Sequence, residues 1–182
     1  MFNLSTQEVV LSIEKTPLVK LNRHVYQEFS NFFGNTDIFD LDFANTEFEK
    51  LENQTKFPRK RLSYNDTFSK QLHIFFMSNK ITKALEEKFQ TELHFKSVDY
   101  WIDGEGYFLE PHIDNESIKL SLQIYLGEDQ PGTVLFDNNE SLKTFHFKND
   151  CGYAMLLNDN TLHGLEHPVM RDGRRSIYVR YQ

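Results

Sequence analysis

The sequence predicts a mainly β fold, a sandwich or barrel of short strands that follows a helical N-terminal part. Apolar residues recur with helical spacing before residue 94 and with strand-like alternation after it. Clusters of Gly, Asn and Asp separate the later apolar segments at short, regular intervals. The content of 17 Phe, 8 Tyr and 1 Trp is enough for a substantial core. We therefore expect one domain over residues 1–182, with a mostly helical support region, 1–93, and a β core, 94–182.

Charge and cysteine content restrict the classes of partner and compartment. The formal net charge is −7, and the chain has no long basic run. Because affinity for nucleic acid comes largely from neutralised phosphates, this balance argues against a DNA or RNA partner. The single cysteine, Cys151, excludes an intramolecular disulfide and fits a reducing compartment. No apolar run approaches a membrane span, and residues 1–10 lack signal-peptide features, so we expect a cytoplasmic protein without a membrane partner; its oligomeric state stays open.

The N-terminal half predicts both strands and helices. Residues 8–21 are rich in Val, Ile and Leu with partial alternation, which favours one or two short strands. Residues 22–33 carry apolar side chains at helical spacing and predict a helix that ends at Gly34. Residues 35–66 are polar and irregular. Residues 67–93 predict two helices with a break near Ser78, and their aromatic stripes indicate a core rather than a cofactor site.

The C-terminal half predicts a series of short strands. Turn-forming clusters separate apolar segments that alternate with polar residues, which is typical of an all-β sandwich or barrel. The expected strands are residues 94–101, 107–113, 118–126, 133–136, 143–147, 153–157 and 176–181.

Two histidines and one aspartate in this half form a candidate metal-ligand set. His112 and Asp114 lie two residues apart in an expected strand, so both side chains leave the same face. His163, followed by Gly164, comes about fifty residues later. Two imidazoles and one carboxylate are the ligands that leave positions open on a non-haem Fe(II). His167 is the alternative to His163 as the third metal ligand.

The order of these motifs resembles a known family. A His-x-Asp at the start of the strand region, a His-Gly further on and an Arg-x-Ser in the last strand are similar to the Fe(II)- and 2-oxoglutarate-dependent dioxygenases, in their prolyl-hydroxylase-like branch. The resemblance covers residues 98–182. It implies a double-stranded β-helix (jelly roll), Fe(II), O2 and 2-oxoglutarate as co-substrate, and leaves room for ascorbate. The implied activity is hydroxylation of a small molecule or a peptide side chain, with succinate and CO2 as co-products.

The resemblance also implies residue roles. It places the metal on His112, Asp114 and His163, because His163 precedes a small residue, although Pro168-Val169 then follows one residue late. For Tyr125 and Tyr100, core packing is the alternative to a role in binding the co-substrate. The residues implied for the co-substrate are Arg174 for its distal carboxylate, Ser176 two residues on, Tyr125, whose phenol would bond the same carboxylate, and Tyr100 as a weaker match.

Alternation in the last strand gives Arg180 a special position. It shares a face with Arg174, which would place a charge inside the fold, whereas Arg175 should face outward. A buried charge needs a partner, and the candidates are Asp114 and the C1 carboxylate of the co-substrate.

Other functions remain open. The run Arg-x-Ser-x-Tyr-x-Arg, residues 174–180, also resembles the Arg-x-Asn-x-Thr-x-Arg of nucleic-acid alkyl-lesion dioxygenases, but departs from it at two of four positions. A non-catalytic cupin-like module would usually present His-x-His. The basic cluster Arg59-Lys60-Arg61 either meets an acidic substrate or forms a solvated face. Lys119 is either a substrate contact or a strand-end lysine that reaches solvent.

Overall fold

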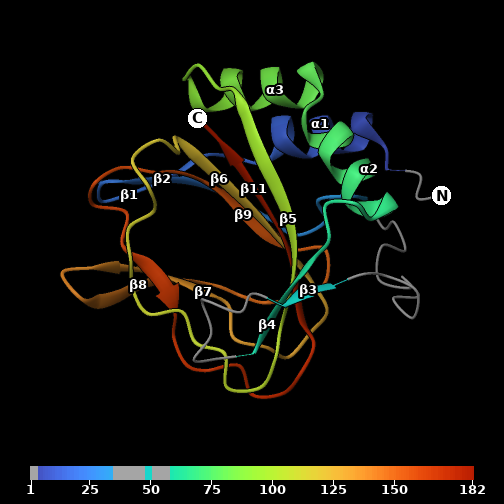
Figure 1. Ribbon diagram of the computed structural model, residues 1–182. Helices are drawn as coiled ribbons and strands as arrows, with labels where there is room; N and C mark the ends of the chain where they lie inside the picture. The colour runs from blue at the N-terminus through green and yellow to red at the C-terminus, as the bar shows by residue number, and fades with distance from the viewer. Residues whose placement is uncertain (1–3, 35–47, 51–57) are drawn as a thin grey trace.

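The computed structural model describes residues 4–34, 48–50 and 58–182. They form two antiparallel sheets that face each other and three helices that cover the outer side of the larger sheet (Figure 1). The strand orders are β1-β2-β9-β6-β11-β5-β4-β3 and β10-β7-β8. The predicted fold class, mainly β with a double-stranded β-helix, is confirmed, although the larger sheet is open rather than closed into a barrel.

The helices and strands have the following bounds. The helices are α1 (Thr6–Lys15), α2 (Thr67–Phe76) and α3 (Asn79–Phe89). The larger sheet contains β1 (Val19–Leu21), β2 (His24–Phe29), β3 (Phe48–Lys50), β4 (Arg59–Leu62), β5 (Phe95–Asp103), β6 (Leu120–Leu126), β9 (Gly152–Leu156) and β11 (Arg174–Tyr181). The smaller sheet contains β7 (Thr133–Asp137), β8 (Glu140–Phe145) and β10 (His163–Leu165). None of the helices described is both long and apolar enough to cross a membrane.

The strands predicted for residues 8–21 are replaced mainly by helix α1, and only β1 remains as a strand. The side chain of Ser5 accepts a hydrogen bond from the backbone N–H of Glu8 and caps the first turn. Val9 and Ile13, four residues apart, are buried on one face. This helical stripe and its cap outweigh the local content of β-branched residues.

The helix predicted for residues 22–33 is wrong, because this segment contains strand β2. Its backbone pairs with β1 on one side and β9 on the other, and the β9 pairing joins Tyr26 to Met155 and Phe29 to Gly152. Val, Tyr and Phe suit a strand once such partners are present. The helical spacing of the apolar residues was coincidental, since long-range pairing supplies the backbone hydrogen bonds.

The two helices predicted within residues 67–93 are confirmed as α2 and α3. Asp66 caps α2 by accepting from the N–H of Phe68, and α3 ends at Gln90 in the left-handed conformation. Together with α1 they bury a large apolar cluster against the outer face of the larger sheet, in which Phe76 is completely buried. The aromatic stripes are therefore core, as expected.

The inner face of the larger sheet differs from the outer face and prepares the site. On β11, Ile177 and Val179 point toward the helices, whereas Arg174, Ser176 and Tyr178 point into the space between the sheets. Strands of both sheets and Phe147, which follows β8, contribute to a second apolar cluster: Tyr26, Tyr125, Leu135, Phe145, Phe147, Tyr153 and Met155. The remaining space is a polar cavity.

Candidate metal and co-substrate site

His112, Asp114 and His163 converge at one end of this cavity. Their potential ligand atoms all lie within 4.8 Å of one another. Nε2 of His112 is 3.4 Å from Oδ1 of Asp114, and Nε2 of His163 is 3.6 Å from Oδ2 of the same carboxylate. The exposed part of the His163 side chain is 5% and that of His112 is 35%, so the cluster is open to solvent on one side only.

Backbone pairing places the two histidines opposite each other. The segment around His112, predicted as a strand over residues 107–113, forms no strand but makes an isolated antiparallel bridge with β10, which the sequence did not predict. The N–H of His112 donates to the carbonyl of His163 and the N–H of His163 donates to that of His112, both at 2.9 Å. Each imidazole is thus positioned by main-chain hydrogen bonds.

The hydrogen bonds of the imidazoles leave Nε2 free to bind a metal. Nδ1 of His112 lies 3.0 Å from the carbonyl oxygen of Glu110, and Nδ1 of His163 lies 3.1 Å from that of Thr161. Because a carbonyl oxygen only accepts, Nδ1 carries a proton in each ring, and Nε2 of each ring faces the carboxylate of Asp114. Such Nδ1 bonds are typical of metal-binding histidines. Burial lowers the pKa of His163, which favours a neutral ring with its lone pair at Nε2, whereas the contact with Asp114 raises the pKa of His112.

Asp114 is held as a carboxylate. Burial raises its pKa, but the His112 contact, the charge of His163 and a hydrogen bond from Tyr178 together lower the pKa of Asp114 to about 2. The phenol of Tyr178 donates to Oδ2 at 2.6 Å. Burial raises the pKa of the Tyr178 phenol, so this group keeps the proton that it donates. The hydrogen bond from Tyr178 therefore fixes the orientation of the Asp114 carboxylate.

Replacing Tyr178 with phenylalanine tests this orientation. The change removes only the phenolic oxygen, so Asp114 loses its donor and can rotate. We expect Fe(II) affinity, measured by anaerobic titration calorimetry, to fall about 10- to 100-fold. Tyr100→Phe is the matched control, since Tyr100 lies on the outer face against Phe68. Equal affinities in the two variants would contradict the role of Tyr178.

Gly164 permits the close approach that aligns the histidines. A Cβ at this position would lie 2.7 Å from the carbonyl oxygen of Leu109 and 3.0 Å from the nitrogen of Pro111. A larger residue would therefore push residues 109–112 away from β10. This accounts physically for the small residue after the second histidine.

The variant Gly164→Ala is expected to lose stability and metal affinity together. Overpacking of this kind costs about 1–3 kcal/mol, and the displaced segment carries His112 with it. Chemical denaturation would measure the first effect and Fe(II) titration the second. Unchanged metal affinity in a destabilised protein would show that the contact with Gly164 does not position His112.

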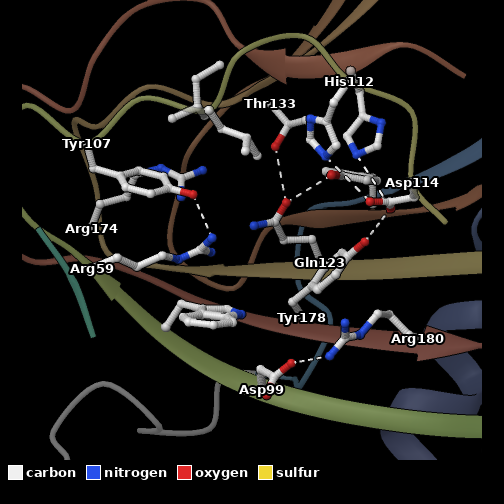
Figure 2. Close-up of a pocket in the computed structure, with 15 residues that line it drawn as sticks. Arg59, Asp99, Tyr107, His112, Asp114, Gln123, Thr133, Arg174, Tyr178 and Arg180 are labelled. Atoms are coloured by element: carbon white, nitrogen blue, oxygen red, sulfur yellow. Dashed lines mark hydrogen bonds and ion pairs between the residues drawn. The ribbon is translucent and has the colours of Figure 1, made fainter. Parts of the chain in front are cut away.

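The cavity extends from the triad to a group of arginines. Its volume is about 180 Å³. In Figure 2, Arg59 and Arg174 lie at the end opposite His112 and Asp114. The lining residues are Arg59, Asp99, Trp101, Tyr107, Leu109, His112, Asp114, Gln123, Thr133, Tyr153, His163, Leu165, Arg174, Tyr178 and Arg180.

Arg174, which the sequence predicts to bind the distal carboxylate of the co-substrate, lines the cavity. Its side chain is 2% exposed; Nε donates to the carbonyl of Pro131 at 2.9 Å, and Nη1 donates to Oδ2 of Asp103 at 2.7 Å. Asp103 also lies 3.0 Å from Nε of Arg59. Arg175 faces the other side of the sheet beside Tyr100, as alternation predicted.

A hydroxyl and an amide occupy the middle of the cavity. Tyr125 is fully buried and its phenol donates to Oγ1 of Thr133, which in turn donates to Oε1 of Gln123. Tyr153 donates to the same Oε1, and the amide of Gln123 donates to Ser176. Neither Tyr125 nor Ser176 lines the cavity, whereas Thr133 does, as do the hydroxyl-bearing side chains of Tyr107, Tyr153 and Tyr178.

Other sequence-predicted residues lie elsewhere or have other partners. Tyr100 packs in the outer core and is not near the cavity, so its expected role in co-substrate binding is wrong. Arg180 lines the cavity, but it pairs with Asp99 rather than with Asp114. His167 is exposed and lines a separate surface cavity. Lys119 is exposed and donates to the carbonyl of Glu92.

The basic cluster at residues 59–61 divides between cavity and surface. Arg59 lines the cavity, Lys60 is exposed, and Arg61 pairs with Glu49 and lies 3.9 Å from Asp99. Sequence reasoning did not assign roles to Thr133, Gln123 and Tyr178. Alternation offered a signal for the last two, because Gln123 shares a face with Tyr125 and Tyr178 shares one with Arg174.

Comparison with solved structures places the fold among the 2-oxoglutarate- and Fe(II)-dependent oxygenases, so the resemblance is confirmed at the level of the fold. A prolyl hydroxylase from Trichoplax adhaerens, solved with a hypoxia inducible factor peptide fragment, matches 97% of this chain and 88% of its own with a TM-score of 0.59 and 11% identity. A prolyl-4-hydroxylase from Pseudomonas putida matches 98% of each chain with a TM-score of 0.56 and 13% identity.

A further match is an oxidoreductase of the 2OG-Fe(II) oxygenase family from Burkholderia pseudomallei. It covers 95% of this chain and 75% of its own, with a TM-score of 0.56 and 13% identity. No family model and no curated protein matches the sequence. The similarity is therefore one of fold, and the chemistry has to be argued from the site.

Proposed function

We propose that this protein is an Fe(II)- and 2-oxoglutarate-dependent oxygenase that hydroxylates a small molecule or a peptide side chain. The observation that carries the proposal is the cluster of His112, Asp114 and His163, whose Nε2 and carboxylate atoms converge at one end of a cavity with Arg174 at the other. The Trichoplax neighbour with its peptide fragment supports a peptide among the candidate substrates.

The residues present suit Fe(II). Two neutral imidazoles and one carboxylate supply three ligands and leave the remaining positions of the ion for other groups. Both Nδ1 atoms are already bound to carbonyl oxygens, and Tyr178 binds the carboxylate, so the ligands have the outer-shell partners that a metal site needs. The partly buried Asp114 carboxylate also supplies the negative charge that a divalent cation requires.

The residues also suit a dicarboxylate co-substrate. Arg174 and Arg59 supply positive charge at the end of the cavity away from the triad, and Thr133 supplies a hydroxyl between the two ends. Guanidinium groups bind carboxylates through charge-assisted hydrogen bonds. One carboxylate of 2-oxoglutarate would bind there while its oxo-acid end reaches the metal.

Each residue then has a distinct task. His112, Asp114 and His163 would hold the ion, which, when bound together with 2-oxoglutarate, would supply the activation of O2, with succinate and CO2 as the co-products of hydroxylation. Trp101, Leu109 and Leu165 line the cavity and limit access of water to the reacting groups.

Anaerobic titration with Fe(II) and then 2-oxoglutarate tests the proposal through the visible metal-to-ligand charge-transfer absorption. We expect the band in the wild-type protein, no band in His112→Ala, and a band that needs a much higher 2-oxoglutarate concentration in Arg174→Ala. Absence of any band in the folded wild-type protein would refute the proposal. Succinate release in the presence of candidate peptides and metabolites would then identify the substrate class, and oligonucleotides would serve as the negative set.

A further inference from the structure

One rung of the larger sheet carries three charged residues in a row. The register of the strands aligns Arg59 of β4 with Asp103 of β5, and Asp103 with Arg174 of β11. The order of charges across the rung is therefore positive, negative, positive. All three side chains point to the inner side of the sheet, where both arginines line the cavity.

Asp103 cancels most of the charge of Arg174. The carboxylate is completely buried and its Oδ2 lies 2.7 Å from Nη1 of Arg174, which is itself 2% exposed. Nε of Arg174 is bound to the carbonyl of Pro131. In such a buried pair the two opposite charges largely neutralise each other. A ligand carboxylate that contacted only the Asp103–Arg174 pair would therefore experience no net positive charge.

Arg59 restores that charge and is rigidly held. Its guanidinium carbon lies 3.9 Å from the ring centre of Trp101 and 4.8 Å from that of Tyr107. Nη1 donates to the phenol of Tyr107 at 2.6 Å, and Nε lies 3.0 Å from Oδ1 of Asp103. The aromatic contacts and these two polar contacts fix the orientation of the group before any ligand arrives.

We propose that Arg59 is a second arginine of the co-substrate site, required because Asp103 neutralises Arg174. This inference rests on the proposed use of 2-oxoglutarate. One carboxylate between two guanidinium groups leaves one net positive charge, which matches the distal carboxylate of the co-substrate. Removal of Arg59 brings the local charge to zero, and removal of the Asp103 charge as well returns it to one.

Equilibrium binding of 2-oxoglutarate to the Zn(II)-loaded protein tests how affinity depends on the net charge of these three residues, and it does so without turnover. The proteins are the wild type, Arg59→Gln, Asp103→Asn and the double variant, with Lys60→Gln as the control from the exposed side of the same strand. We expect Arg59→Gln to weaken binding about 10- to 100-fold, as for a lost charge-assisted hydrogen bond. Asp103→Asn raises the local charge from one to two and should bind more tightly than the wild type, whereas Lys60→Gln should bind like the wild type.

The double variant and a second ligand separate charge from structure. We expect the double variant to recover most of the affinity that Arg59→Gln loses. We expect 2-oxopentanoate, which lacks the distal carboxylate, to bind the wild type and Arg59→Gln equally. An Arg59→Gln protein that binds 2-oxoglutarate like the wild type overturns the inference, and so does equal weakening for both ligands. A wild-type protein that binds Zn(II) but not 2-oxoglutarate refutes the proposed function itself.

Discussion

Replacing His163 with alanine is expected to remove Fe(II) binding almost completely. The buried ring supplies one of three ligands, and the remaining pair lies at the more exposed side of the cluster. Loss of an outer-shell partner already costs up to about 100-fold in metal affinity, and loss of a ligand should exceed that. Anaerobic titration calorimetry measures the change directly, and the charge-transfer band reports the same loss by an independent signal.

His167→Ala is the matched control for this prediction. It removes an imidazole four residues along the chain that is exposed and stands outside the cluster. Its Fe(II) affinity should equal that of the wild type. A result with the two variants exchanged, with His167→Ala unable to bind and His163→Ala unaffected, would show that the wrong histidine has been assigned to the metal.

Truncation of Phe76 to alanine is expected to produce the largest loss of stability. The ring is completely buried and contacts Phe32, Phe33 and Phe75. Removal of such a ring leaves a cavity and typically costs about 3–5 kcal/mol in the free energy of unfolding. Denaturant unfolding followed by circular dichroism would measure it.

Ile74 in the same helix provides the comparison. Its side chain is 67% exposed, so Ile74→Ala should change the unfolding free energy by no more than about 0.5 kcal/mol. Similar losses for the two variants would mean that α2 does not pack through its aromatic face.

Alternation predicted the inner face of the last strand because it is a local property. Residues at every second position of a strand share a face whatever the strand pairs with, so Arg174 and Arg180 could be assigned to the cavity from the sequence alone. Their partners could not. Asp103 and Asp99 belong to β5, about seventy to eighty residues earlier, and the register between β5 and β11 depends on the whole sheet.

Errors arose where distant backbone decided the local structure. Strand β2 forms because β9 pairs with it, and its apolar residues happen to recur with helical spacing. Residues 107–113 are predicted as a regular strand, but this segment makes only one isolated bridge to β10, at His112. Tyr100 matched a family position, yet its parity on β5 is opposite to that of Asp99 and Trp101, which directs it to the outer core.

Arg59 shows a third limit of sequence reasoning. It lies in a cluster of three basic residues within a polar region, and such clusters are usually solvated. The pairing of β4 with β5 places it beside Asp103 and against Trp101, and this could not be inferred from the cluster itself. Residues 51–57, which come shortly before it, lie outside the described residues.

The reciprocal hydrogen bonds between His112 and His163 have a consequence for how the ion is acquired. These bonds, and those from each Nδ1 to a carbonyl oxygen, involve no metal atom, so the ligands are gathered when the chain folds. The protein resembles a pre-assembled chelator, in which the entropy of bringing donors together is already lost. Unlike a zinc finger, which unfolds when its ion is withdrawn, it should release and reload its ion as an intact domain.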